Sequence, residues 1–188
     1  MDALLLDFPE SFESDRLTIR APRPGDGAEI NAAVRETFDD LKVWMPWAQQ
    51  MPTLEESEAF VRRAQSEFLG RQDLTLLLFL KGTNTLVGGS GLHQINWDIP
   101  KFEIGYWCRK RFQGQGYITE STEAITTFAF DILGAKRVGI RCDAKNVRSR
   151  RIPERLGFKL EGTLRHDSLS LTGELRDTLV FAKIKDSA

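Results

Sequence analysis

The sequence predicts an α/β protein of one domain, residues 1–188, built around a mixed β-sheet. Its 188 residues fit one domain, since domains commonly run to roughly 100–200 residues. A hydrophobic fraction of 41% with 28% charged residues is typical of a chain that folds around its own core. Short apolar runs alternate with longer amphipathic stretches in the order β α α β β β α β α β β, which predicts a mixed sheet covered by helices.

The first half of the chain predicts one strand, two helices and three further strands. The segment RLTIR at 16–20 alternates as a strand does, and the PRPGDG turn at 22–27 leads into a helix near 28–37. The segment VWMPWAQQMP at 43–52 reads as a loop. Thr53 and Glu56 form a capping-box pattern, so a helix is expected to run to about Leu69. The strands expected next are 74–80, 86 to about 94 and 102–108, with a hairpin turn at 81–85 between the first two.

The second half predicts two helices and three strands. Ile118, Ile125 and Phe128 fall on one stripe of a helix expected over about 115–133, and Gly134 is a plausible stop. The remaining elements are expected as a strand at 138–142, a short helix at about 148–156, and strands at about 158–167 and 175–183 around a turn near Thr172–Gly173.

Composition narrows the function classes. A net charge of −1 argues against a general nucleic-acid binder. The acidic, short-apolar start MDALLLDFPE does not read as a targeting signal, and the apolar run at 76–80 is too short to span a bilayer, so we expect a cytoplasmic protein that does not bind membranes. Cys108 and Cys142 are expected to be buried free thiols. His93 and His166 show no metal-ligand spacing, so no metal is expected.

The small net charge hides an uneven distribution. Residues 1–108 carry a net charge of −7, residues 109–155 carry +6, and the rest are neutral. The positive block therefore predicts an anionic ligand, and the negative half favours a cationic one.

The segment RFQGQGYITES at 111–121 carries the clearest chemical signal. Gly114 and Gly116 allow a sharp turn and leave space for a ligand, and the helix that follows offers unpaired N–H groups and its positive dipole end to an anion. By itself, the GxG pair is explained equally well by a plain strand-to-helix turn that binds no ligand. A Rossmann fingerprint is excluded because Thr119 stands where the third glycine belongs, and no P-loop pattern is present.

Three flanking motifs make this signal specific. They are the strand EIGYW at 103–107, the loop RFQGQG at 111–116, and an N-x-x-S helix start at 146–149 that ends in LGF at 156–158. With these motifs the chain resembles the GNAT superfamily of acyl-CoA-dependent N-acyltransferases over about 16–183. Within it the chain is similar to the RimJ/RimL-like branch, whose named members acetylate the N-termini of ribosomal proteins.

The resemblance implies a single GNAT-type domain with a mostly antiparallel sheet, splayed to admit acetyl-CoA as co-substrate and flanked by about four helices. Pantetheine would add to the end of the strand before the glycine loop, and the pyrophosphate would bind the loop. The cofactor-binding residues this implies are Tyr106, Trp107, Cys108, Arg109, Arg111, Gln113, Gly114, Gln115, Gly116, Tyr117, Asn146, Ser149 and Arg151.

The implied reaction is direct acetyl transfer to an amine in a ternary complex. Glu103 is the first candidate for the general base. A glutamate that only stabilises the sheet or forms a salt bridge would give the same sequence pattern. Many members of the superfamily place a tyrosine acid where this chain has Pro153, which we expect to be tolerated early in the helix. Ser149 is therefore the candidate to hydrogen-bond the thiolate, and His93 or His166 remain alternative bases.

The candidate acceptor-binding residues are Trp44, Trp47 and His93. The two tryptophans belong to an apolar loop that would equally serve as core or as a dimer surface, so the protein is expected to be a monomer or a homodimer. The leading acceptor is the α-amine of a protein or peptide. The alternatives are a small amine, such as an amino acid, polyamine or drug, and a non-catalytic acyl-CoA-binding regulatory domain, which Pro153 keeps open.

Overall fold

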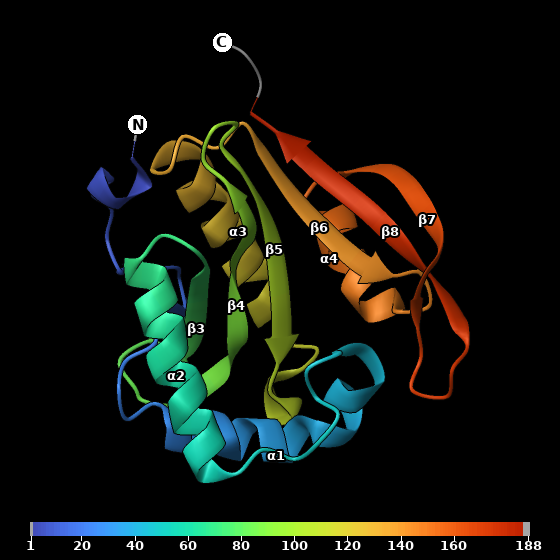
Figure 1. The fold of residues 1–188 in the computed structure, drawn as a ribbon, viewed down its shortest axis with the longest axis horizontal. Helices are drawn as coiled ribbons and strands as arrows, with labels where there is room; N and C mark the ends of the chain where they lie inside the picture. Colours follow the sequence, from blue (N-terminus) through green and yellow to red (C-terminus); the bar gives the residue numbers. More distant parts are fainter. Residues whose placement is uncertain (1, 186–188) are drawn as a thin grey trace.

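A computed structural model describes residues 2–185, and its centre is one eight-stranded sheet (Figure 1). The strand order is β1-β2-β3-β4-β5-β6-β8-β7, and every neighbouring pair is antiparallel except the parallel pair β5–β6. The strands are β1 Ser11–Glu13, β2 Leu17–Arg20, β3 Leu74–Leu80, β4 Leu86–Asn96, β5 Lys101–Cys108, β6 Arg137–Asp143, β7 Lys159–Leu169 and β8 Leu175–Ile184. The helices are α1 Gly27–Trp44, α2 Leu54–Leu69, α3 Tyr117–Asp131 and α4 Val147–Arg155, with short 3₁₀ turns at Ala3–Leu5 and Lys110–Phe112.

The helices cover the two faces of the sheet. In Figure 1, α3 lies behind β4 and β5, while α1 and α2 lie on the near side. The larger core joins Ile125 and Phe128 of α3 to the sheet residues Leu78 and Ile104. A second core joins Ile30 and Val34 of α1 and Val61 of α2 to Leu77, Phe79 and Leu86 on the opposite face. The alternation of apolar residues along β3 therefore feeds both cores.

The strands β5 and β6 separate after a short paired section. Their partners are Lys101 with Arg137, Phe102 with Val138 and Glu103 with Gly139, and pairing stops there. Figure 1 shows the two strands diverging from that point. The splayed sheet that the resemblance implied is therefore confirmed, and it opens one side of the backbone of β5 from residue 104 onward.

The predicted elements are present, with shifted ends and two differences. Helix α1 continues to Trp44 instead of ending near residue 37, because Leu41 extends the buried stripe of Ile30, Val34 and Thr37 at helical spacing. Strand β1 was not expected, since three residues carry too little pattern and only the pairing with β2 defines them. The predicted capping box of Thr53 and Glu56 is confirmed at the start of α2.

Among residues 2–185, no helix is long and apolar enough to cross a membrane. Within the same range, no cluster of three or more His, Cys, Asp or Glu side chains could hold a metal ion.

Candidate active site

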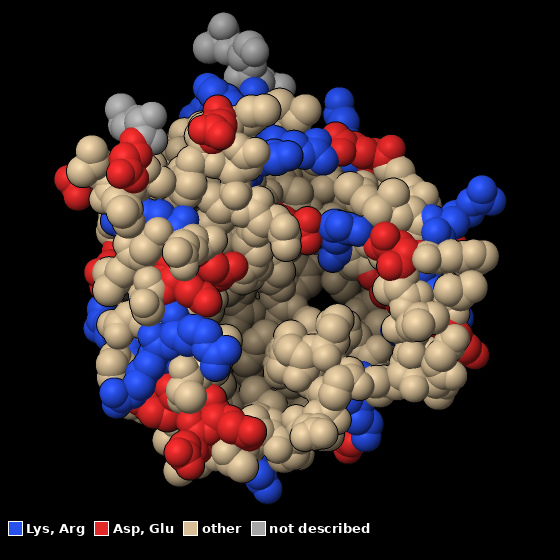
Figure 2. Space-filling model, in the orientation of Figure 1, with Lys and Arg blue, Asp and Glu red and all other residues tan. Residues whose placement is uncertain are grey.

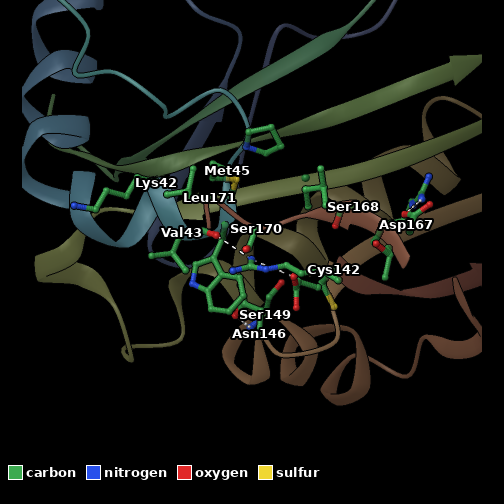
Figure 3. A pocket seen from close by; sticks show the side chains of 18 of the residues that line it. Lys42, Val43, Met45, Cys142, Asn146, Ser149, Asp167, Ser168, Ser170 and Leu171 are labelled. Carbon is green, nitrogen blue, oxygen red and sulfur yellow. Dashed lines mark hydrogen bonds and ion pairs between the residues drawn. The ribbon is translucent and has the colours of Figure 1, made fainter. Parts of the chain in front are cut away.

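A cavity of about 740 Å³ lies where β5 and β6 separate. Figure 2 shows the hollow near the middle of the viewed face. Its walls come from the end of α1, from β5 and β6, from the first turn of α4 and from the β7–β8 hairpin. In Figure 3, Asn146 and Ser149 reach in from α4, while Val43 and Met45 come from the opposite wall. Four segments far apart in the sequence thus form one site.

The open side of β5 offers backbone hydrogen-bonding groups to this region. The N–H of Arg109 donates to the carbonyl of Val87 in β4 at 2.7 Å. Backbone groups of a strand alternate in direction, so those of Tyr106 and Cys108 point away from β4 and into the gap. An extended ligand with amide groups, such as pantetheine, can add to this edge as a further strand.

The N-terminus of α3 forms a cradle for an anion. Gly116 is the residue before the helix and has a φ of 83°, and Gly114 has a φ of 73°, both in the left-handed region that favours glycine. No side chain caps this end of α3, so the N–H groups of Tyr117 and the next residues remain available to a ligand. Gln115 donates its side-chain amide to the Arg111 carbonyl at 2.7 Å and so braces the loop.

Replacing Gly116 by valine is expected to weaken acetyl-CoA binding at least tenfold, because a β-branched residue is strained at this φ and places carbon atoms over the N–H cradle. Isothermal titration with CoA measures the effect. Gly134→Val is the matched control, since Gly134 has a φ of 67° at the far end of α3 and so introduces similar strain away from the cradle. Equal CoA affinity in the Gly116 variant and the wild type would remove the cradle from the binding site.

Arg109 lies elsewhere than the phosphate-binding interpretation expects. Its side chain is buried between α1 and β5 and pairs with Glu29 and Glu36, each at 2.7 Å. Burial alone would raise the pKa of Glu36, but hydrogen bonds from Arg109 and the Arg111 N–H and the charges of both guanidinium groups hold that pKa below its usual value. Arg109 therefore joins α1 to the start of the glycine loop and does not line the cavity.

Helix α1 also holds the rest of the loop. Thr37 accepts the N–H of Lys110 at 3.0 Å, Asp40 accepts the Gln113 amide at 3.1 Å, and the exposed Arg111 lies 3.2 Å from Glu36. The side-chain Oε1 of Gln113 in turn accepts a hydrogen bond from Arg148 of α4 at 3.2 Å. The acidic face of α1 thus positions the loop through side chains, a role that the sequence-based interpretation did not give it.

The positive block at 109–155 is only partly available to an anion. Several of its arginines are paired within the protein, namely Arg109, Arg137 with Glu161, Arg141 with Asp167, and Arg150 with Glu154. Lys110, Arg148 and Arg151 form no ion pair within residues 2–185, and all three are exposed. Arg148 contacts the glycine loop through the side chain of Gln113, so it is better placed for phosphate groups than Arg109.

The first turn of α4 brings three candidate residues together. The Asn146 side chain caps the helix by accepting the Ser149 N–H at 3.1 Å, as its N-cap position predicts. The Tyr106 hydroxyl donates to the Ser149 carbonyl at 3.0 Å, and the Ser149 hydroxyl donates to the Tyr106 oxygen at 3.2 Å. Burial raises the pKa of Tyr106, partly offset by its hydrogen bond with Ser149, so its hydroxyl stays protonated.

The expectation that Pro153 lies early in its helix is wrong. It is buried at the seventh of the nine residues of α4. A proline there removes the N–H that would bond the carbonyl four residues earlier, which is that of Ser149. The Tyr106 hydroxyl occupies this freed carbonyl. The structure therefore compensates for the proline with a bond from β5 to α4, beside the cavity.

The two cysteines are free within the described residues, but only Cys142 is buried, whereas Cys108 is half-buried. Burial raises the pKa of both thiols, in Cys108 to about 12, so both are protonated at neutral pH. Neither has the lowered pKa of a nucleophilic cysteine.

Glu103 lies in the cavity wall, half-buried, at the point where β5 and β6 separate. Burial raises its pKa, against the opposing effects of Arg141 and His93. Within residues 2–185 its carboxylate accepts no hydrogen bond and forms no ion pair. A free carboxylate with a raised pKa in a cavity has the properties of a general base.

The three acceptor-side candidates are placed differently. Trp44 lines the cavity and carries the Arg176 guanidinium 5.0 Å above its ring. Trp47 lies outside the cavity lining and packs edge-to-face on Trp107, with ring centroids 6.3 Å apart. His93 also lies outside the lining and pairs with Asp73, Nδ1 to Oδ2, at 2.7 Å. His166 is exposed on β7 and likewise outside the lining.

Arg176 and Asp143 are cavity residues that sequence reasoning missed. Arg176 bonds the Val43 carbonyl at 3.0 Å and Asp143 at 3.2 Å, and so ties the end of α1 to β8 and β6. No local pattern marks either residue, because their partners lie up to 133 positions away in the sequence.

The sequence model of the family described as "Acetyltransferase (GNAT) domain" matches residues 16–159, and the chain belongs to this family. The protein is therefore an acetyltransferase with acetyl-CoA as its co-substrate. Its relatives support the RimJ/RimL-like branch.

Two relatives are similar over most of their length. The Bacillus subtilis (strain 168) protein YdaF, provisionally named a ribosomal N-acetyltransferase, is 29% identical over 173 residues, covering 92% of this chain and 93% of YdaF. The ribosomal-protein-serine acetyltransferase of Escherichia coli (strain K12) is 26% identical over 148 residues, covering 78% of this chain and 82% of the enzyme. Among solved structures, RimL, a ribosomal L7/L12 α-N-protein acetyltransferase in complex with coenzyme A, aligns with a TM-score of 0.86 at 24% identity over 93% of this chain and 98% of RimL.

Proposed function

We propose that this protein acetylates the N-terminal α-amine of a protein or peptide by direct attack on acetyl-CoA in a ternary complex. The observation that carries the proposal is the unpaired Glu103 carboxylate in a cavity continuous with the open edge of β5. A thioester extended along β5 and an amine in the cavity would meet beside this carboxylate. Relatives named for acetylation of ribosomal proteins support a protein acceptor.

The strength of the base favours an α-amine over a lysine side chain. An α-amine has a pKa near ~8 and is partly neutral at pH 7, whereas a lysine amine near ~10.4 is almost wholly charged. Glu103 remains a carboxyl group even with its raised pKa. Such a base suffices for the α-ammonium, which is the stronger acid of the two and gives up its proton more readily.

The departing thiolate would be stabilised from α4. The Ser149 and Tyr106 hydroxyl groups lie together at the cavity wall. The Tyr106 hydroxyl donates to the Ser149 carbonyl and holds that residue in place, while the Ser149 hydroxyl can turn from the Tyr106 oxygen to donate its proton to the sulfur. Ser149 would thus take the role of the tyrosine that Pro153 replaces in this chain.

A thiol-release assay with acetyl-CoA tests the proposal against its rivals. Turnover of peptides with free N-termini, but not of the same peptides blocked at the N-terminus and carrying a lysine, is the expected result. Turnover of amino acids or polyamines in place of peptides would support a small-amine acetyltransferase. Tight CoA binding with no turnover of either panel would favour a regulatory acyl-CoA-binding domain.

Replacing Trp44 by alanine is expected to raise the KM for a peptide acceptor about tenfold, or ~1.4 kcal/mol, while acetyl-CoA affinity stays the same. The reason is that Trp44 forms a wall of the cavity and holds Arg176 against it. Trp47→Ala is the matched comparison, because Trp47 is 53% exposed and outside the lining. A larger KM effect from Trp47 would place the acceptor on the outer surface of the α1–α2 loop instead.

A further inference from the structure

Acetyl transfer to an ammonium ion releases one proton to solvent per turnover. The acceptor R–NH₃⁺ and acetyl-S-CoA give R–NH–acetyl, HS-CoA and H⁺: the C–N bond forms, the C–S bond breaks, one nitrogen proton ends on sulfur and a second leaves. In the proposed function, on which this inference rests, Glu103 takes a proton from the ammonium. With the acceptor and acetyl-CoA both bound in the cavity that Glu103 lines, water would be displaced from around its carboxylate, so its proton would need a separate route out.

His93 is next to Glu103 on the side of the sheet away from β6. The two residues are direct cross-strand partners of β4 and β5, so their side chains leave the same face with Cβ atoms about 5 Å apart. The His93 ring lies over two glycines. A Cβ atom on Gly91 would come within 2.9 Å of Nε2, and one on Gly105 within 3.5 Å of it. The imidazole thus reaches across β4 to β5, and the missing side chains at 91 and 105 leave room for it.

Asp73 fixes the orientation of this ring. Its Oδ2 lies 2.7 Å from His93 Nδ1, and its Oδ1 accepts the Thr75 hydroxyl at 2.9 Å. A carboxylate on Nδ1 selects the tautomer with the proton on Nδ1 and leaves Nε2 free to accept a proton. His93 Nε2, the ring nitrogen that can accept a proton, therefore faces the side of β5 that carries Gly105, a residue of the cavity wall.

The pair also has an outlet. The side chains of His93 and Asp73 are 33% and 28% exposed, while Glu103 faces the cavity. We propose that His93, positioned by Asp73, carries the proton from Glu103 to solvent. Protonated His93 then sits against the Asp73 carboxylate and releases its proton on its exposed side. His93 and Asp73 act through Glu103, so neither needs to contact acetyl-CoA or the acceptor.

Three charged groups of the described residues face this path. Asp73, just before β3, lies against His93 Nδ1, Glu103 on β5 is the proton source, and Arg141 on β6 acts on Glu103 from the other side. Arg141 is itself paired with Asp167 at 2.8 Å. The relay therefore runs away from Arg141, toward the Asp73 carboxylate.

The test compares kcat across pH for the wild type, His93→Ala and Asp73→Asn, at saturating acetyl-CoA and with the best acceptor found. His93→Ala is expected to lower kcat about tenfold to hundredfold near pH 7, with CoA affinity unchanged, and added imidazole is expected to restore it in proportion to its concentration. Asp73→Asn is expected to lower kcat by a similar factor at an unchanged melting temperature. His166→Gln, on the outer strand β7, is the control and keeps wild-type kcat.

Histidine NMR gives a readout that does not depend on turnover. The Nδ1-protonated tautomer of His93 is expected in the wild type and its loss in Asp73→Asn. A kcat of His93→Ala within twofold of the wild type, or a loss that imidazole does not restore while Asp73→Asn stays fully active, would overturn the relay. Failure of the proposed acceptor is a distinct outcome, because a small amine that is turned over still tests His93.

Discussion

Glu103→Gln is expected to lower kcat about 10²- to 10³-fold near pH 7 while CoA affinity stays within about twofold of the wild type. The glutamine keeps the shape of the side chain but accepts no proton from the ammonium. In the wild type, activity is lost as pH falls through the raised pKa of Glu103, because the protonated carboxyl is no base. The variant lacks this loss of activity at low pH. The dependence of the rate on protonation of the acceptor amine is the same in both proteins.

The same substitution is expected to act on stability in the opposite sense. A carboxyl whose pKa is raised on folding binds more protons folded than unfolded, so its contribution is present at low pH and is lost as pH rises through the folded-state pKa. Glu103→Gln should therefore gain stability over the wild type as pH rises from about 4 to 7. Glu123→Gln on the exposed face of α3 is the control for both measurements.

The kinetic assay and urea unfolding across pH together decide the role of Glu103. Lower kcat with equal or higher stability identifies a group placed for chemistry at the expense of stability. A wild-type kcat in the variant would remove Glu103 from the base role. Lower kcat with lower stability at pH 7 would indicate a structural glutamate, the alternative that the sequence left open.

Arg109→Met is expected to destabilise the protein by about 3 kcal/mol at pH 7, because it removes the buried guanidinium that binds both Glu29 and Glu36 and leaves Glu36 with the exposed Arg111 alone. The two carboxylates are 36% and 28% exposed, so the effect is placed at the lower end of the range for buried pairs. Urea unfolding measures it. Arg62→Met is the control, since the Arg62 side chain in the Arg62–Glu58 pair on α2 is 64% exposed, against 5% for Arg109, and its loss should change stability by less than ~0.5 kcal/mol.

The destabilisation is expected to shrink as pH falls. A carboxyl with a lowered pKa, as Glu36 has, adds stability that is present above its unfolded-state pKa and is lost as pH falls through its folded-state pKa. The triple variant Arg109→Met, Glu29→Gln and Glu36→Gln should recover most of the loss, because no charge is left without a partner. If Arg109→Met alone is as stable as the wild type, the ion pairs of Arg109 with Glu29 and Glu36 do not hold α1 against the glycine loop.

Much of the fold follows from local patterns in the sequence. The alternation at 16–20, the apolar strand at 74–80, the capping box at Thr53 and the helical stripe of α3 each depend on neighbours within a few residues, and the structure confirms them. The end of α1 was missed because Leu41 gains its stabilisation from packing in the second core, and no local stop signal distinguishes residues 38–44. The sequence-based expectation also placed Pro153 too early in α4. The backbone hydrogen bond that this proline removes is replaced by the Tyr106 hydroxyl, which comes from β5.

The sequence by itself determined the family and the glycine loop, because these depend on residue types at short, fixed spacings whose backbone requirements are local. The tertiary structure decided which charged groups remain free. In the positive block at 109–155, Arg109, Arg137 and Arg141 pair with carboxylates from other elements. Within residues 2–185 the Glu103 carboxylate in the cavity has no such partner, and His93 pairs with Asp73 outside the cavity lining. Ion pairing depends on distances of a few ångströms across the fold, and residues far apart in the chain acquire such distances only when the sheet forms.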